Sequence, residues 1–301
     1  MAKFRSNHRR EQRGLFSGIF RLFLLLALGI IILLCSKPFI QSLVYKLYPS
    51  DQAPDLRSED LFYLPAPDEN PVYHYVGFTL AYQEAYEQAR WVAYELNVEH
   101  LNLPKVSRSD YFKEDLSIKT GSASFYDYKG SGYTKGHLVP AADRAYSIET
   151  MEETFLMSNM TPQTYECNGG IWRELEEQTR DWARSNRSVY IVTGPIFSRM
   201  GIQRIGKNRV AVPHSFFKVI LDHTEPEIKG IGFIIPNDIS DRPLQDYVYT
   251  IDAVEEKTGI DFFYELFTDK LEDSIESQVQ LEAWPFNKKR YETRLNQWNK
   301  R

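Results

Sequence analysis

The chain of 301 residues carries 36 basic and 41 acidic side chains, which gives a formal net charge of −5. Six of those basic residues and one of those acids lie within residues 1–21, so the rest of the chain keeps 30 basic and 40 acidic residues. This acidic balance excludes a protein that coats nucleic acid through bulk charge, but it is compatible with an enzyme that has a local basic cleft. The two cysteines, Cys35 and Cys167, offer no zinc-ligand spacing, and we expect no disulfide between them.

An apolar segment at residues 14–36, interrupted only by Arg21, is the first predicted element. About twenty apolar residues span a bilayer, and the basic residues before Gly14 would stay on the cytoplasmic side. We therefore predict a cytoplasmic N-terminus at residues 1–13, a transmembrane signal-anchor at 14–36, and a cell-membrane protein whose body is extracytoplasmic, either periplasmic or external. A cleaved signal peptide is the alternative, although no small-x-small cleavage site follows the segment.

Residues 37–71 are rich in proline and predict a tether, because proline at close spacing breaks both helix and sheet. From residue 72 to residue 285 we predict one domain, followed by a basic, loosely packed tail at 286–301. Aromatic and β-branched runs predict strands, so the fold class is α+β with a mixed or antiparallel sheet. The predicted strands are 72–82, 91–96, 189–193, 210–221, 228–236 and 247–251; the predicted helices are 84–90, 169–184 and 252–258; residues 105–132 are expected to form a long loop.

A first candidate motif surrounds His137, which follows a glycine and a lysine in the segment 132–137 (GYTKGH). A neutral histidine can accept a proton from water near neutral pH. Gly132 and Gly136 would allow the backbone to approach a substrate closely. A lone histidine is more often structural than catalytic, so the motif by itself leaves both interpretations open.

A second candidate motif places Asn168, Trp172, Glu176 and Arg180 four residues apart, which brings them to one face of a helix. The amide oxygen and the carboxylate are hard ligands of the kind that Mg²⁺ prefers, and an arginine suits a phosphate. The alternative interpretation is a surface helix that is capped by Asn168, stabilised by a Glu176–Arg180 ion pair, and anchored in the core by Trp172.

Together the two motifs resemble the DNA/RNA non-specific endonuclease family of the ββα-metal type, which includes Serratia-type and endonuclease G-like nucleases. The family signature Asp-Arg-Gly-His, with an apolar residue and then an alanine, is similar to the segment 134–138 (TKGHL) followed by Ala142. Thr134 and Lys135 replace the family's Asp and Arg, which puts the rate in doubt rather than the type of reaction. The resemblance covers about residues 72–267, and its downstream pattern is matched by Asn159, Pro162, Gln163, Asn168, Trp172, Leu175, Glu176 and Arg180.

The resemblance implies a ββα-metal finger and a Mg²⁺ cofactor, with Mn²⁺ as a substitute. Asn168 would bind the metal, His137 would deprotonate the attacking water, and Glu176 would orient metal-bound waters as a second base. Asn159 would hold either the histidine loop or the metal helix in place.

The same resemblance assigns three cations to the phosphate of the substrate: Lys135, Arg180 and, more weakly, Arg108. None of these groups reads a base edge, so the expected activity is a membrane-anchored, sequence-non-specific endonuclease that acts on DNA, RNA or both. A homodimer is left open. Two alternative functions remain. The first is a catalytically weakened nuclease fold that binds nucleic acid or a protein, and only the Thr134-Lys135 pair favours it. The second is a hydrolase that acts on another substrate, for which the sequence has no serine elbow and no zinc motif.

Overall fold

The computed structural model describes residues 63–198, 201–224, 227–264 and 269–300. They belong to one unit that extends from Leu56 to Arg301. The predicted cytoplasmic N-terminus, the signal-anchor at 14–36 and most of the tether lie outside the described residues. Within the part of the chain that the structure describes, no helix is both long enough and apolar enough to cross a bilayer.

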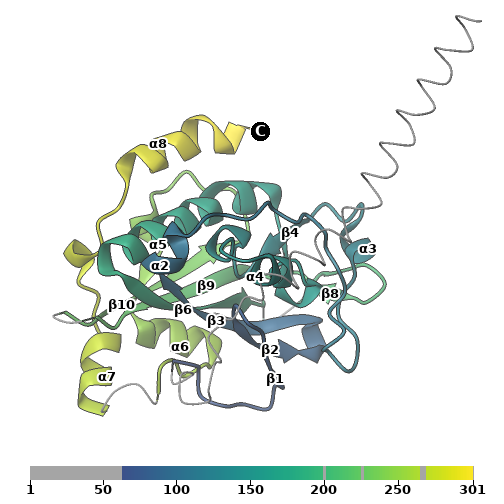
Figure 1. Ribbon diagram of the computed structural model, residues 1–301, viewed down its shortest axis with the longest axis horizontal. Coiled ribbons are helices and arrows are strands. Elements are labelled where there is room, and N and C mark those ends of the chain that lie inside the picture. Colours follow the sequence, from purple (N-terminus) through teal and green to yellow (C-terminus); the bar gives the residue numbers. More distant parts are fainter. Residues whose placement is uncertain (1–62, 199–200, 225–226, 265–268, 301) are drawn as a thin grey trace, which may run out of the picture. The chain divides into compact units, whose positions relative to one another are not determined.

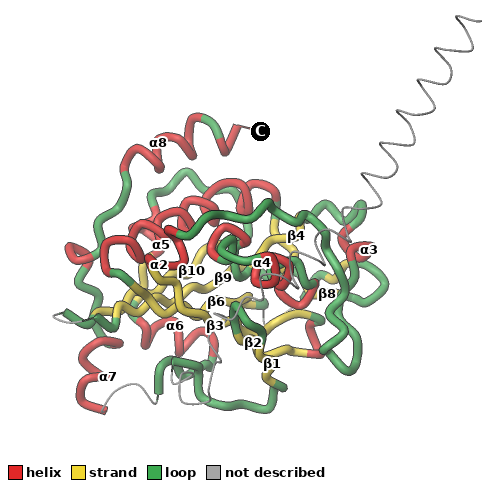
Figure 2. The backbone as a smooth tube through the Cα atoms, in the orientation of Figure 1, coloured by secondary structure: helices red, strands yellow, loops and turns green. Residues whose placement is uncertain are grey.

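A seven-stranded sheet with the order β1-β2-β3-β6-β9-β10-β11 forms the centre of this unit. All of its neighbouring strands are antiparallel, as the predicted fold class allows, and helices cover both of its faces (Figures 1 and 2). Its strands are β1 (Val72–His74), β2 (Thr79–Gln83), β3 (Gln88–Asn97), β6 (Ser188–Ile196), β9 (Ser215–Asp222), β10 (Lys229–Pro236) and β11 (Val248–Tyr249). Two small sheets pair β4 (Thr134–His137) with β5 (Met160–Gln163) and β7 (Arg204–Ile205) with β8 (Val210–Ala211). The α-helices are α2 (Val98–Asn102), α3 (Phe125–Tyr128), α4 (Ile148–Glu153), α5 (Arg173–Asn186), α6 (Ile251–Thr258), α7 (Asp269–Glu276) and α8 (Lys288–Asn296).

The sheet divides the core into two apolar clusters, because successive side chains of a strand point to opposite faces. On β3, Tyr94 joins the cluster that contains Trp182 of α5, and its neighbour Ala93 joins the cluster that contains Val254 of α6. All four side chains are at most 1% exposed. Burying a large apolar side chain stabilises a fold by about 1.5–3 kcal/mol, so these two layers fix α5 and α6 on opposite faces of the sheet.

Two predicted strands are each divided in the structure. The predicted strand 72–82 is the hairpin β1–β2, in which the amide of Tyr75 donates to the carbonyl of Phe78 at 2.8 Å and closes the turn. The predicted strand 210–221 is β8 followed by β9, with Pro213 between them. Proline has no N–H to donate to a sheet, which is consistent with an interruption at this residue.

Glycine and backbone conformation explain two further differences. The predicted helix 84–90 is only a short 3₁₀ turn, because Glu87 adopts a left-handed φ of 56° and β3 begins directly after it. The predicted strand 189–193 is longer in the structure, because β6 continues through Gly194. A Cβ atom there would lie 2.3 Å from the carbonyl oxygen of Arg90, so the glycine is required by close packing of strands.

The described end of the predicted tether packs against the domain. Tyr63 is 6% exposed and stacks on Tyr190 with 4.6 Å between ring centroids. The amide of Ala66 donates to the carbonyl of Asp261 at 2.9 Å, and Asp68 forms an ion pair with Arg90 at 2.6 Å. Residues 63–71, the described end of the predicted tether, are therefore held against the domain by these contacts.

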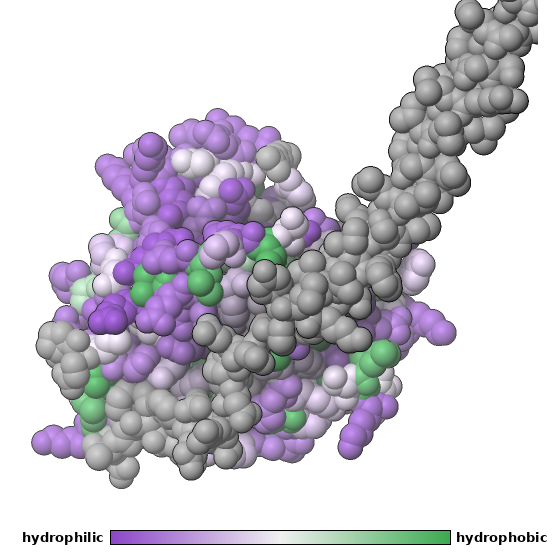
Figure 3. Space-filling view, in the orientation of Figure 1, coloured by the Kyte–Doolittle hydropathy of each residue, from purple (hydrophilic) through white to green (hydrophobic). Residues whose placement is uncertain are grey.

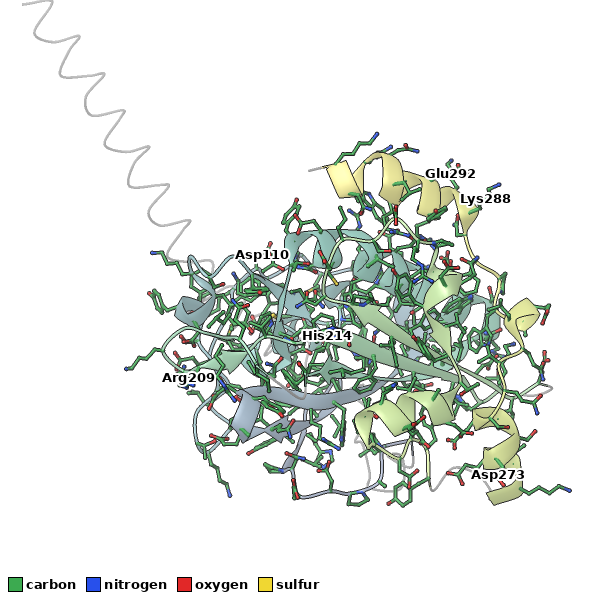
Figure 4. All side chains as sticks on the ribbon, turned by 180° about the vertical axis from the view of Figure 1, so that it is seen from behind. Asp110, Arg209, His214, Asp273, Lys288 and Glu292 are labelled. Atoms are coloured by element: carbon green, nitrogen blue, oxygen red, sulfur yellow. The ribbon has the colours of Figure 1, made fainter. Side chains whose placement is uncertain are left out.

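The predicted loose tail forms helix α8 and packs on α5. Arg294 is fully buried and donates to the carboxylate of Glu174, and Gln178 donates to the carbonyl of Pro285 at 3.0 Å. Lys288 and Glu292, labelled in Figure 4, lie on the exposed side of α8, and the surface around this helix in Figure 3 is mostly hydrophilic. Arg290 and Arg294 of this segment pair with acids of α5, which makes it part of the domain.

Candidate active site

The two motifs of the sequence analysis meet in a strand-strand-helix element. Strand β4 pairs antiparallel with β5, so that Thr134 lies opposite Gln163 and His137 lies opposite Met160. A π-helical turn, Cys167–Trp172, follows β5 and runs directly into α5. His137 at the end of β4 and the side chains at the start of the helix therefore face a common space.

Gly136 is required by the packing of this element. A Cβ atom at this position would lie 2.1 Å from Oε1 of Gln163, whose side chain crosses β4. The prediction that Gly136 admits a substrate is therefore wrong, because a neighbouring strand already fills that space. Gly132 has a φ of +86°, which is the left-handed conformation that glycine adopts without steric cost.

The side chain of Asn168 is tied to β4 and does not cap the helix. Its Nδ2 donates to Oγ1 of Thr134 at 2.9 Å, and this hydroxyl donates in turn to the carbonyl of Gln163 at 3.0 Å. The residue that precedes the π-helical turn, Glu166, makes no side-chain cap either. With Nδ2 fixed, Oδ1 of Asn168 accepts no hydrogen bond from any described residue, and Asn168 lines the cleft described next.

A cleft with a volume of about 280 Å³ collects nearly all of the predicted site residues. It lies between the β4 strand, the start of α5 and the loop before α3. Asn159 is the predicted site residue that does not line it. The predicted residues that do are Arg108, Lys135, His137, Asn168, Glu176 and Arg180.

The imidazole of His137 is held by aromatic rings. It packs edge-on against Phe155 with 5.0 Å between centroids, and its Nε2 is buried without a hydrogen bond to any described residue. Burial, together with the cations Arg108 and Lys135, lowers the pKa of His137 to about 3, against an opposing effect of Asp110. The imidazole is therefore neutral near pH 7 and has a lone pair that can accept a proton.

Glu176 sits at the buried end of the cleft and makes no hydrogen bond or ion pair within the described residues. Burial raises the pKa of its carboxyl group, and Asp143 adds to this, whereas Arg180 and Lys218 lower the pKa. The expected Glu176–Arg180 ion pair is absent from the described part of the chain, since Nη1 of Arg180 binds Oδ1 of Asp143 at 2.7 Å instead. The side chain of Arg180 is 11% exposed and is anchored by Asp143. It also lines the cleft.

Asn159 is buried behind the cleft and positions the chain that follows His137. Its Oδ1 accepts from the amide of Val139 at 2.9 Å, and its Nδ2 donates to the carbonyls of Val139 and Thr154 at 3.1 and 2.9 Å. This matches the expected holding role for the histidine loop. Asn159 is therefore not a catalytic residue, because its side chain is buried and does not line the cleft.

Two cations that line the cleft, Lys135 and Arg108, lie over aromatic rings. Nζ of Lys135 lies 4.6 and 4.9 Å from the ring centroids of Phe125 and Phe112. Arg108 stacks over Phe155 at 5.0 Å and pairs with Asp110 at 2.6 Å, with 51% of its side chain exposed. A cation above an aromatic face is attracted to it and keeps its N–H donors free for an anion.

Three further side chains shape the site and were not predicted from the sequence. Asp143 anchors Arg180, Thr134 orients the amide of Asn168, and the charge of Lys218 on β9 lowers the pKa of Glu176. Asp143 and Thr134 flank His137 in the first motif, so they were visible as polar residues without a role. Lys218 was visible as one charge in an otherwise apolar strand.

A cluster of carboxylates also lies on the opposite face of the sheet. Oxygen atoms of Asp252, Glu255 and Glu276 approach one another within 4.8 Å on α6 and α7. This cluster shares no residue with the cleft and was not predicted from the sequence.

The donors present in the cleft fit a hard divalent cation. Asn168 Oδ1 and the Glu176 carboxylate are oxygen atoms without hydrogen bonds to described residues, and Mg²⁺ takes few protein oxygens while keeping most of its waters. The neutral imidazole of His137 and the cations Lys135, Arg108 and Arg180 line the same cleft. The fold and the cleft thus define a class: an α+β protein equipped for metal-assisted hydrolysis of phosphate esters.

Comparisons with known proteins agree with this class. The DNA/RNA non-specific endonuclease family matches residues 61–269. The mitochondrial nuclease EXOG of Xenopus laevis is 37% identical over 216 residues, which cover 65% of this chain and 59% of that protein. The mitochondrial endonuclease G of Homo sapiens is 36% identical over 198 residues, which cover 62% and 67% of the two chains. The chain belongs to the DNA/RNA non-specific endonuclease family, and the predicted family and hydrolase class are confirmed.

A further relative and a solved structure give the same result. A nuclease of Nostoc sp. is 34% identical over 214 residues, which cover 67% of this chain and 76% of that protein. A crystal structure of an EndoG/EndoGI complex, concerned with EndoG inhibition, superposes with a TM-score of 0.64 at 29% identity and covers 67% of this chain and 89% of that chain. The chain spans less than two thirds of the Xenopus relative's length.

Proposed function

We propose that this protein is a membrane-anchored, Mg²⁺-dependent endonuclease that hydrolyses phosphodiester bonds of DNA and RNA without sequence preference. One observation carries the proposal: His137, Asn168 and Glu176 line a single cleft, with the oxygens of the latter two free of hydrogen bonds to described residues. Family membership supports the reaction type. The weakened-nuclease alternative rests on the Thr134-Lys135 pair, and Thr134 binds the side chain of the proposed metal ligand Asn168.

Each side chain of the cleft has a distinct role in this proposal. Asn168 holds the metal through Oδ1 while Thr134 fixes the amide. His137 accepts the proton of the attacking water, and Glu176 orients the waters around the metal. When bound, Mg²⁺ or its substitute Mn²⁺ supplies positive charge that neutralises the phosphate in the transition state. A bound phosphate also offsets the cations near His137, which favours proton transfer to it.

The substrate is recognised through its backbone. Lys135, Arg180 and Arg108 present positive charge along the cleft, and charge recognises phosphate without regard to base identity. The test is cleavage of supercoiled plasmid and of a long RNA by the full-length protein in Mg²⁺, in EDTA, and in EDTA with Mg²⁺ restored. We expect cleavage with randomly distributed ends that EDTA abolishes and Mg²⁺ restores. Cleavage that EDTA leaves unchanged would contradict the proposal.

Lys135 provides a prediction about the phosphate contact. Lys135→Ala is expected to slow cleavage by roughly 10- to 150-fold, since a hydrogen bond to a charged group contributes about 1.5–3 kcal/mol. Lys135→Arg is expected to preserve or raise the rate, because a guanidinium also stacks on Phe112 and Phe125 and adds a planar fork. Steady-state cleavage rates measure both effects. Lys113→Ala, which removes a lysine paired with Glu152 outside the cleft, is the matched control.

That interpretation of Lys135 has a clear contrary outcome. If Lys135→Ala cleaves at the wild-type rate, Lys135 does not contact the scissile phosphate and Arg180 serves it alone. If Lys113→Ala loses as much activity as Lys135→Ala, the effect comes from general surface charge.

The membrane topology gives an independent prediction. Basic residues before an apolar stretch at 14–36 favour a cytoplasmic N-terminus and an external body. Protease added to intact spheroplasts is expected to digest the nuclease domain while a cytoplasmic marker stays whole. Protection of the domain until the cells are lysed would place it in the cytoplasm and contradict the topology. A homodimer stays a prediction, which light scattering of the detergent-solubilised protein would test.

A further inference from the structure

Arg173, the first residue of α5, is a cation of the cleft to which the proposed function gives no role. It lines the cleft together with Asn168 and Glu176, and 46% of its side chain is exposed. Its Nε donates to Oε1 of Glu177 at 3.0 Å, and its Cζ lies 4.0 Å from the ring centroid of Trp298. Neither Nη atom forms a hydrogen bond within the described residues. The guanidinium group is therefore held in place and keeps N–H donors for a ligand.

Trp298 reaches Arg173 because the C-terminal segment is fastened to α5. Helix α8 lies on the side of α5 away from the central sheet (Figure 1), and its fully buried Arg294 donates to a carboxylate of α5. The 3₁₀ turn Trp298–Lys300 follows, and Asn299 in this turn donates to the carbonyl of Ser240 at 2.7 Å. This segment lies beyond residues 61–269, which the family matches. Its contact with the cleft is thus an addition to the part of the chain that matches the family.

The charges around Arg173 leave an excess of positive charge. Glu177 accepts from Arg173 through Oε1 and from Arg290 of α8 through Oε2, the latter at 3.1 Å. Arg290 also pairs with Asp181 at 2.7 Å, and Asp181 pairs with Arg184 at 3.2 Å. This chain of ion pairs contains three guanidinium groups and two carboxylates, which leaves one net positive charge. Arg173 is the end of the chain that lines the cleft, so an anion there meets a cation that its partners do not fully neutralise.

We propose that Arg173 forms a second phosphate subsite of the cleft and that Trp298 is the positioning residue that holds its guanidinium group there. The inference rests on the proposed function, since the ligand is the phosphate backbone of the nucleic-acid substrate. A planar guanidinium donates two parallel hydrogen bonds to a phosphate, and stacking on an aromatic ring leaves these donors free. Arg173 and Arg180 begin about 10 Å apart along the axis of α5. Arg173 is therefore assigned a phosphate next to the scissile one.

The test of the subsite is the binding of a fluorescently labelled DNA duplex in EDTA, together with cleavage kinetics in Mg²⁺. Arg173→Ala is expected to weaken binding by roughly 10- to 150-fold, the effect of one lost charge-assisted contact. The slope of log K against log salt is expected to fall by about one, because one phosphate contact is removed. KM is expected to rise with little change in kcat, because the subsite contacts no reacting atom.

The matched control is Arg184→Ala on the same helix. The side chain of Arg184 is 43% exposed and forms an ion pair at the surface, as Arg173 does, but it does not line the cleft. Its replacement is expected to leave the affinity, the salt slope and KM unchanged. Both arginines are partly exposed, so both variants are expected to unfold near the wild-type temperature.

Two replacements of Trp298 test its positioning role. Trp298→Phe keeps an aromatic face for the guanidinium group and is expected to bind the duplex like the wild type. Trp298→Leu is expected to weaken binding by roughly 2- to 5-fold, the range of a partly exposed cation–π contact. In an Arg173→Ala background, Trp298→Leu is expected to cause no further loss, because its effect passes through Arg173.

The outcomes separate this inference from the proposed function. Wild-type protein that binds the duplex but does not cleave it in Mg²⁺ contradicts the proposed function itself. A cleaving wild type together with an Arg173→Ala protein of unchanged affinity, salt slope and KM overturns the subsite. An equal loss in Arg184→Ala also overturns it, because general surface charge then explains the binding. Equal affinities of the Trp298→Leu and wild-type proteins overturn the positioning role of Trp298.

Discussion

Replacement of His137 by alanine is expected to reduce the cleavage rate by roughly 10²–10⁴-fold, the range that a lost general base produces. The reason is structural as well as chemical. The imidazole is neutral in its aromatic setting, so it can accept the proton of the attacking water. Single-turnover cleavage of plasmid in saturating Mg²⁺ measures the effect.

The His137 prediction separates a base from a metal ligand. Mg²⁺ affinity, measured by calorimetry, is expected to persist in His137→Ala, because the proposed ligand is Asn168. The matched control is His214→Ala, an exposed histidine outside the cleft that is labelled in Figure 4. If His137→Ala loses Mg²⁺ affinity and Asn168→Ala keeps it, the two roles must be exchanged.

Replacement of Asn168 by alanine is expected to abolish Mg²⁺-dependent cleavage, with a loss at least as large as that of His137→Ala. The variant loses the proposed ligand oxygen and one hydrogen bond to Thr134, and a hydrogen bond of this kind contributes only about 0.5–1.5 kcal/mol to stability. The fold should therefore survive. Cleavage rates, Mg²⁺ calorimetry and thermal unfolding together measure the change.

The Asn168 prediction also has a conservative variant. Asn168→Asp keeps a hard oxygen but cannot donate to Thr134, so it is expected to retain Mg²⁺ binding with reduced turnover. Near wild-type cleavage by Asn168→Ala would remove Asn168 from the site. Loss of binding in Asn168→Ala together with unfolding would instead indicate a structural role.

The local sequence pattern predicted two elements with nearly correct bounds. Strand β10 and helix α6 match the predictions 228–236 and 252–258 closely. The β1–β2 hairpin was read as one strand because its turn at Tyr75–Phe78 has none of the usual two-residue turn sequences.

Contacts between distant parts of the chain explain why the tail was predicted wrongly. Read alone, residues 286–301 are polar and basic, and such a segment buries little apolar surface. In the structure Arg290 pairs with Glu177 at 3.1 Å and with Asp181 at 2.7 Å, both on α5. These partners lie more than 100 residues away, so spacing within the tail could not reveal them.

Some residues of the candidate site could be predicted from the sequence, and others depend on contacts between distant parts of the chain. His137, Asn168 and Glu176 could be predicted because a short spacing relates Asn168 to Glu176 and the motif resemblance adds His137. Lys218 could not be assigned a role, because only the antiparallel pairing of β6, β9 and β10 places its side chain under α5. The partner of Arg180 was predicted as Glu176 from i,i+4 spacing, whereas Asp143 competes from a separate loop.

The central claim is that a metal ion binds in the cleft at Asn168, beside His137. The most direct test is a crystal structure of the His137→Ala protein with Mn²⁺, located by its anomalous scattering. We expect a peak about 2.1 Å from Oδ1 of Asn168, with waters completing the coordination near Glu176. A peak only among Asp252, Glu255 and Glu276 on the opposite face of the sheet, with none at Asn168, would contradict the account.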